Sequence, residues 1–115
     1  MLENYTEVLR SRKVFVSEHG GRIVGLLILA GTSEGFILEN VAVHPDFSGQ
    51  GLGHRFLLLA EQEAIADGHA SIHLYTHEKM VRNIDLYEKV GYVMYDRRTE
   101  GPYTRVFMRK TLGSR

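Results

Sequence analysis

The chain has 115 residues, of which 43% are hydrophobic and 24% charged, an ordinary globular composition whose length suits one domain over residues 1–115. Fourteen basic and fourteen acidic residues cancel, so no overall charge attracts nucleic acid or an anionic membrane. There is no cysteine, which excludes disulfides and a thiol nucleophile. With no membrane-length apolar run and no visible secretory signal, we expect a cytoplasmic protein with neither nucleic acid nor membrane as partner.

The first part of the chain predicts one helix and three strands. Leu2, Tyr5 and Leu9 recur at helical spacing, which predicts a helix over residues 1–12. The alternating patterns that follow predict strands at residues 13–18, 22–30 and 36–43. Short glycine-rich turns separate these strands, so we expect an antiparallel meander with the nearly all-apolar second strand at its centre.

The second part predicts a helix, a strand, another helix and a hairpin. An apolar stripe of Leu52, Phe56 and Leu59 marks a helix over residues 50–66. The strand expected at residues 71–76 follows this crossover helix, so it should lie parallel to the third strand. The remaining elements are a helix at 81–89 and strands at 92–98 and 104–111.

The stretch from Val41 to Gly53 carries the strongest functional signal. A strand ends at Pro45, and the glycines at 49, 51 and 53 then open the next helix. Glycine removes Cβ atoms, so bare backbone can approach a ligand, and the free N–H groups of a helix start attract phosphate. A plain helix start would not need three glycines, because each one disfavours the helix. We therefore predict a phosphate-binding loop.

Two common phosphate-binding motifs do not fit this loop. A P-loop requires Gly-Lys-Ser/Thr after its glycines, whereas Gly53 is followed by His54 and Arg55. A dinucleotide-binding fingerprint that starts at Gly49 would need glycine at its sixth position, where His54 stands. The spacing therefore indicates a different class of phosphate-containing ligand.

Residues 41–53 have the form Val-x-Val-x-Pro, a short turn and Gly-x-Gly-x-Gly, which resembles motif A of the GCN5-related N-acetyltransferases (GNAT). A second segment, Leu86-Tyr87-Glu88-Lys89-Val90-Gly91-Tyr92, is similar to a late motif of that family, Leu-Tyr-x-Lys-x-Gly-Phe/Tyr. The resemblance implies an α/β fold with a GNAT-like mixed, mostly antiparallel central sheet flanked by helices. The usual first strand and first helix of the family are lacking here.

The resemblance also implies acetyl-CoA as cosubstrate and no metal. In the family, loop amides hold its pyrophosphate, and the preceding strand runs along the pantetheine arm. The residues that match those positions here are Gln50, Gly51, Gly53 and His54 in the loop and Val41, Ala42 and Val43 in the strand. The family usually has Arg or Gln where Ser48 stands, and Arg55 is either a further phosphate contact or a solvated side chain. Asn83 is a candidate to replace an asparagine whose place is taken by Met80.

Two residues are candidates for proton transfer. Tyr87 occupies the position that, by resemblance, protonates the departing thiolate; the alternative is a core tyrosine in line with Ile84. Glu39 lies in an otherwise apolar strand, before an expected kink at Asn40-Val41, and is either the general base or an ordinary outward-facing residue. His44 and His73 are fallback bases.

A metal site is disfavoured by spacing. His73 and His77 would lie about 13 Å apart on an extended strand, too far to share one ion. We therefore expect an N-acetyltransferase that moves an acetyl group directly to a primary amine of a small molecule or peptide, without an acyl-enzyme. The alternatives are a coenzyme-A-binding module or truncated GNAT domain without a complete acceptor site, and a structural or protein-interaction domain.

The short N-terminal part has one consequence for assembly. Without the family's first elements, the strand from Lys13 to Glu18 should form an exposed edge of the sheet. Proteins usually cover such edges. We expect either a homodimer that covers residues 13–18 or a chain that belongs to a longer protein.

Overall fold

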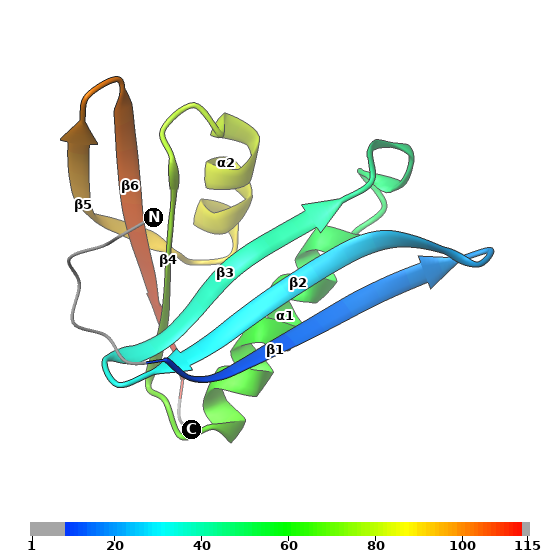
Figure 1. Ribbon diagram of the computed structural model, residues 1–115, viewed down its shortest axis with the longest axis horizontal. Helices are drawn as coiled ribbons and strands as arrows, with labels where there is room; N and C mark the ends of the chain where they lie inside the picture. The colour runs from blue at the N-terminus through cyan, green and yellow to red at the C-terminus, as the bar shows by residue number, and fades with distance from the viewer. Residues whose placement is uncertain (1–8, 114–115) are drawn as a thin grey trace.

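The computed structural model describes residues 9–113, which build one mixed six-stranded sheet (Figure 1). The strands lie in the order β1-β2-β3-β4-β6-β5. Strand β4 is parallel to β3 and every other neighbouring pair is antiparallel, which confirms the predicted meander, the parallel crossover and the C-terminal hairpin. The strands span β1 (Leu9–His19), β2 (Arg22–Thr32), β3 (Gly35–Val43), β4 (Ser71–His77), β5 (Val93–Glu100) and β6 (Tyr103–Thr111).

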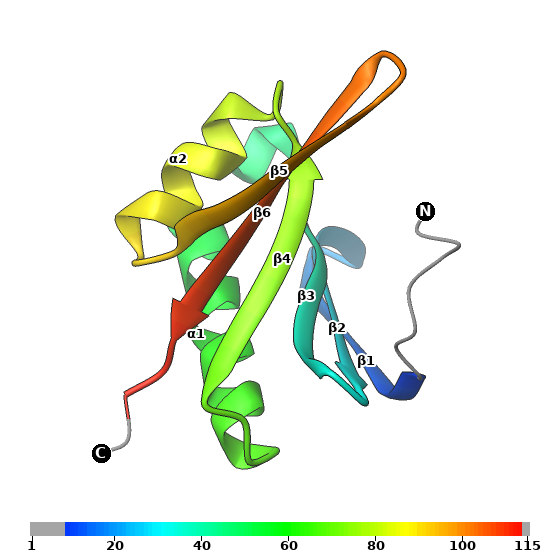
Figure 2. The same ribbon diagram turned by 90° about the vertical axis from the view of Figure 1, so that its left-hand side faces the viewer.

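Two helices lie on the same face of this sheet (Figure 2). Helix α1 (Leu52–Ala66) starts two residues later than predicted, and α2 (Val81–Lys89) has the predicted bounds. A single 3₁₀ turn, η1 (Pro45–Phe47), connects β3 to the loop before α1. Among the described helices, none combines the length and the apolar character that a membrane span requires.

The helix predicted over residues 1–12 is wrong at its C-terminal end. Leu9 to Arg12 belong to β1, where Leu9 pairs with Thr32 and Arg12 with Ala30. Strand β2 extends to Thr32, two residues beyond its predicted end, so it supplies backbone partners for this part of the chain. Tertiary pairing therefore outweighs the helical spacing of the local sequence. Residues 1–8 lie outside the described part of the chain.

The core lies between the sheet and the two helices. Its most deeply buried side chains come from β2, α1, β4 and β6, and include Leu27, Leu57, Ile72 and Met108. Helix α1 approaches β2 so closely that a Cβ atom on Gly25 would lie 2.8 Å from the ring of Phe56. This close packing sets the position of the α1 N-terminus relative to the sheet.

The opposite surface of the sheet, which we call the open face, carries the alternate side chains of each strand. On β1, Phe15 packs against the core, whereas its neighbours Val14 and Val16 are 57% and 48% exposed. Strand β1 is also an outer strand of the sheet, as predicted for residues 13–18. The N-terminal half of the sheet therefore presents both an apolar surface and an outer edge.

Candidate active site

The parallel strands β3 and β4 separate soon after they meet. Only Phe36 with Ile72 and Ile37 with His73 are paired, although β3 continues to Val43. Figure 1 shows the two strands diverging from that point, with α2 between their far ends. The diverging strands expose the β3 backbone on the side that faces β4, and we call this space the slot.

A β-bulge marks the start of the slot. Ile28 of β2 pairs with Asn40 and Leu29 pairs with Leu38, so Glu39 is the extra residue on β3. The bulge lies one residue before the kink that we expected at Asn40-Val41. A bulge bends its strand, which turns the outer part of β3 away from β4.

The loop after β3 has the geometry of an anion cradle. Gly49 and Gly51 have φ values of 78° and 86°, a region that residues with a Cβ rarely adopt, and a Cβ built on either would meet no atom within 4 Å. Gly51 caps α1 without a side-chain hydrogen bond, and the Arg55 N–H donates to its carbonyl at 3.0 Å. The backbone at Gly49 and Gly51 is therefore open to solvent, and the free N–H groups of the first helical turn follow it at the positive end of the helix dipole.

The residues before the loop hold each other in place. Both the N–H and the hydroxyl of Ser48 donate to the Pro45 carbonyl, at 3.3 Å and 2.9 Å. The Asp46 N–H donates to Nδ1 of His44 at 3.1 Å. The Ser48 side chain thus completes the turn, and His44 supports it. The predicted loop residues Gln50 and His54 are exposed beside it, as is Arg55.

Gly53 has a different role from the other two loop glycines. A Cβ at this position would lie 3.4 Å from Leu86 of α2 and 3.9 Å from Val43 of β3. The absence of a side chain therefore lets the end of β3, the start of α1 and α2 pack together. The side chains of Val41 and Val43 pack against the core, while Ala42 lines a cavity of about 270 Å³ with Leu26 and His44.

Tyr87 lies on the inward side of α2 and is only 4% exposed. Its ring centroid lies 5.7 Å from that of Tyr92, and burial raises the pKa of Tyr87 to about 12. The phenol is therefore fully protonated at neutral pH. Asn83 is half-buried one helical turn earlier, so the two side chains share a side of α2.

Glu39 is held by an ion pair and is not beside the loop. The Arg12 guanidinium donates from Nε and from a terminal nitrogen to the two carboxylate oxygens, at 2.8 Å and 3.1 Å. Along the strand, Glu39 precedes Val43 by about 13 Å. The structure therefore places Glu39 at the start of the slot, and the loop beyond its far end.

The two fallback bases lie in different places. His44 supports the turn, and its Nε2 lies 3.4 Å from an Arg22 nitrogen. His73 is at the start of the slot, where burial and then the charge of Arg109 lower its pKa. Its Nε2 is buried without a hydrogen-bond partner in the described structure. Within residues 9–113, no group of three His, Asp or Glu side chains is arranged to hold a metal ion.

Two features of this region were not predicted. Arg12, the partner of Glu39, falls within the segment that the sequence assigned to a helix. The other is a set of arginine and aromatic side chains on the open face of β4, β5 and β6. The two-residue spacing of Arg105, Phe107 and Arg109 was the available signal, because strand residues two apart share a face.

Comparison with known proteins gives one consistent result. Residues 10–94 match the family model described as "Acetyltransferase (GNAT) domain". A curated relative from Pectobacterium atrosepticum, named an acetyltransferase, is 34% identical over 81 residues. That match covers 70% of this chain and 57% of the relative, so the chain spans little more than half the length of the curated relative.

Solved structures share the fold at low sequence identity. A protein described as a streptothricin acetyltransferase of Bacillus anthracis, in complex with acetyl coenzyme A, matches with a TM-score of 0.83 and 19% identity over 90% of this chain and 64% of its own. A GNAT family acetyltransferase of Elizabethkingia anophelis with acetyl-CoA bound has a TM-score of 0.77 and 18% identity, over 89% of this chain and 77% of its own. These likenesses establish the fold.

Proposed function

This chain belongs to the GNAT family of acetyltransferases, and on that premise we propose that it moves an acetyl group from acetyl-CoA directly to a primary amine of a small molecule or peptide. The observation that carries the proposal is the open backbone at Gly51, at the start of α1 and next to the strand that borders the slot. Amides with open space before them at a helix start bind phosphate oxygens.

The residues present fit such a cosubstrate. The loop amides from Gln50 to His54, with Gly51 and Gly53 between them, would hold the pyrophosphate. The exposed backbone of Val41, Ala42 and Val43 would bind the pantetheine arm, and Asn83 lies at the start of the helix between the diverging strands. When bound, acetyl-CoA supplies an activated acetyl group as a thioester.

We assign the proton transfers to two residues. Transfer forms a carbon–nitrogen bond and breaks a carbon–sulfur bond, so one proton must leave the amine and one must reach the departing sulfur. Tyr87 holds a proton at neutral pH and would donate it to the sulfur. Glu39 would accept the amine proton once its ion pair with Arg12 opens, because that pair occupies both carboxylate oxygens.

The deciding experiment separates an enzyme from a coenzyme-A-binding module. Coenzyme A should raise the melting temperature of the protein in both cases. Only an enzyme releases free thiol from acetyl-CoA when a panel of primary amines is added. A thermal shift without thiol release would support the binding module, and the absence of any thermal shift would reject both.

We also propose that a second copy of the chain covers the outer edge of β1. If two β1 strands paired antiparallel about Val14, Arg10 of each would lie opposite Glu18 of the other. Within residues 9–113 neither of these two side chains has an ion partner. The exposed Val14 and Val16 would pack near the two-fold axis that relates the two chains.

A further inference from the structure

A cavity of about 290 Å³ lies beside the slot, between the end of β4 and the start of β6. The residues that line it are Tyr75, Thr76, His77, Tyr103 and Arg105. Because β4 pairs with β3 only as far as His73, the part of β4 that lines this cavity also borders the slot. A group bound in the cavity would therefore lie about one strand spacing, roughly 5 Å, from the slot.

The cavity and the proposed proton donor lie on opposite faces of the sheet. Leu74 packs in the core, so Tyr75 and His77 of the same strand point to the open face. Tyr87 belongs to α2, which lies on the other face (Figure 2). An amine that enters from the cavity would thus approach a thioester in the slot from the side opposite Tyr87, toward which the sulfur departs.

Two rings form a corner of this cavity. The rings of His77 and Tyr103 lie at 89° to each other, with their centroids 5.6 Å apart. His77 is held in place, because its Nδ1 accepts a hydrogen bond from the Lys79 N–H at 3.1 Å and its carbonyl accepts one from the Met80 N–H at 3.0 Å. Tyr103 is 60% exposed, and within residues 9–113 no guanidinium lies over its ring. The Tyr103 ring is therefore open to a ligand.

The cavity has no charge to offer a ligand. Among the described residues that line it, Arg105 is the charged one. Its guanidinium lies 5.9 Å from the ring centroid of Tyr75 and donates to the Glu100 carboxylate at 3.0 Å. The pair neutralises both charges, and Arg105 covers the Tyr75 ring. The cavity therefore provides neither a free carboxylate for a second ammonium group nor a free cation for an acid.

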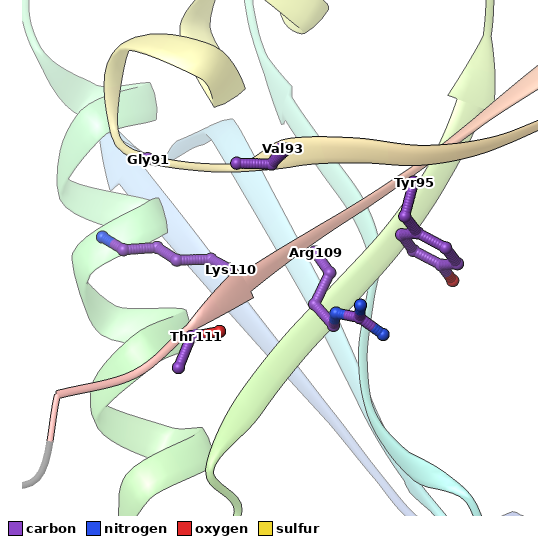
Figure 3. Close-up of a pocket in the computed structure, with 6 residues that line it drawn as sticks. All are labelled: Gly91, Val93, Tyr95, Arg109, Lys110 and Thr111. Atoms are coloured by element: carbon purple, nitrogen blue, oxygen red, sulfur yellow. The ribbon is translucent and has the colours of Figure 1, made fainter.

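A second cavity, of about 320 Å³, does not combine these properties. It lies where β5 begins, and Figure 3 shows Tyr95 and Arg109 among the residues that line it. The Arg109 guanidinium lies 4.7 Å from the ring centroid of Tyr95 and so covers that ring. Strands β6 and β4 separate β5 from the slot. Tyr95 therefore serves as a comparison for Tyr103.

We propose that the corner of His77 and Tyr103 binds a planar aromatic ring of the acetyl acceptor, which is therefore a monoamine that carries such a ring. This rests on the proposed acetyltransferase function, because the amine must reach the slot. Aromatic rings prefer offset-stacked or edge-to-face contacts, and two perpendicular rings offer both to one ligand ring. A polyamine is disfavoured, because its second ammonium group would enter the cavity without a partner.

The test compares phenethylamine with cyclohexylethylamine, whose ring has a similar size but is not planar. Phenethylamine should have a kcat/KM about fivefold higher, mainly through a lower KM, because contacts between aromatic rings add to the burial of apolar area. Tyr103→Leu should remove that preference, and Tyr103→Phe should keep it. Tyr95→Leu is the matched control, because Tyr95 is also an exposed tyrosine of the β5–β6 hairpin, and it should keep the preference. All three variants should retain the melting shift with coenzyme A.

Direct binding separates this inference from the proposed function. Calorimetry with the coenzyme-A-saturated protein should show that phenethylamine binds and that Tyr103→Leu weakens its binding about fivefold. Such binding without thiol release from any amine would contradict the acetyltransferase function and keep the aromatic site. Three results would overturn the site, while thiol release with other amines would keep the function: no binding of phenethylamine, equal use of the two amines by the wild type, or an unchanged preference in Tyr103→Leu.

Discussion

Two tyrosines share the space between α2 and the sheet, and they differ in what their hydroxyl groups do. Tyr92 is 2% exposed, and its hydroxyl has no hydrogen-bond partner in the described structure. Burial raises the pKa of Tyr92 above its usual value, with a smaller contribution from the charge of Glu61. Tyr87 lies against it, but it occupies the position in the late motif to which we assign a proton transfer. The pair therefore offers a matched test of that role.

Replacing Tyr87 by Phe should lower kcat about 100-fold and leave coenzyme A affinity nearly unchanged, because only the transferred proton is lost. Tyr92→Phe should leave kcat unchanged. It should raise the free energy of unfolding by about 1 kcal/mol, because it removes a buried hydroxyl without a partner. Steady-state kinetics and urea unfolding measure both effects. Loss of affinity alone in Tyr87→Phe would show that this tyrosine serves packing.

His73 predicts a pH dependence of stability. Its pKa is lowered in the folded protein, mainly by burial and then by Arg109, so the unfolded chain takes up the proton first as the pH falls below about 6.5. The contribution of His73 to the free energy of unfolding should therefore be complete above that pH and should decrease as the pH falls through and below it. The charge of Glu34 raises the pKa of His73, and the charge of His69 lowers it further.

Urea unfolding between pH 7.5 and 5 measures this loss. In His73→Gln the fall in stability with decreasing pH should be smaller, because the titrating group is gone. His54→Gln, a change at an exposed helix residue, should retain the wild-type dependence. An unchanged pH profile in His73→Gln would show that other groups cause the loss.

At the scale of elements, the two ends of α1 have similar backbones and different surroundings. Gly51 before the helix and Gly68 after it have φ values of 86° and 85°, and a Cβ on either would meet no neighbour. The first stands at the positive end of the helix dipole, next to the slot. The second follows the opposite end, where the His69 N–H donates to the Ala64 carbonyl at 2.9 Å. Only the Gly51 end suits a phosphate.

Valine at Gly51 should abolish the melting shift caused by coenzyme A, because its side chain would project into the space in front of the loop amides. Gly68→Val is the control, since it places the same side chain in the same left-handed backbone region. Each change should destabilise the apoprotein by about 1–2 kcal/mol. Differential scanning fluorimetry with and without coenzyme A compares them. A wild-type shift in Gly51→Val would remove the loop from the site.

At the scale of the whole molecule, the sheet carries both described helices on one face. The open face is apolar over β1 and β2 and aromatic and cationic over β4, β6 and β5. The slot lies between these two regions. The proposed association with a second chain involves the first region.

The proposed dimer predicts that the protein in solution has the mass of two chains. Light scattering after size-exclusion chromatography should give twice the chain mass of 13.1 kDa. Val16→Lys should yield the monomer without loss of folding, because Val16 is half-exposed and lysine on an edge strand opposes pairing. Thr111→Lys, on the opposite half of the sheet, should remain dimeric. A wild-type protein that is monodisperse at the mass of one chain would contradict the dimer.

Local patterns in the sequence determined most elements and the loop. Helix α2 has its predicted bounds, and β2 to β6 lie within two residues of theirs, because hydrophobic periodicity and turn residues act over a few neighbouring positions. The family was likewise predictable from the motif that contains Gly49 and Gly51 and from the late motif. The tertiary structure decided what depends on strand pairing. Residues 9–12 form a strand because they pair with β2, and Arg12 forms an ion pair with Glu39, which is 27 positions away in the sequence. The strand order β4-β6-β5 brings the rings of Tyr75, Phe107 and Tyr95 next to one another. Such contacts join residues far apart in the chain, and their register is set by packing of the whole sheet.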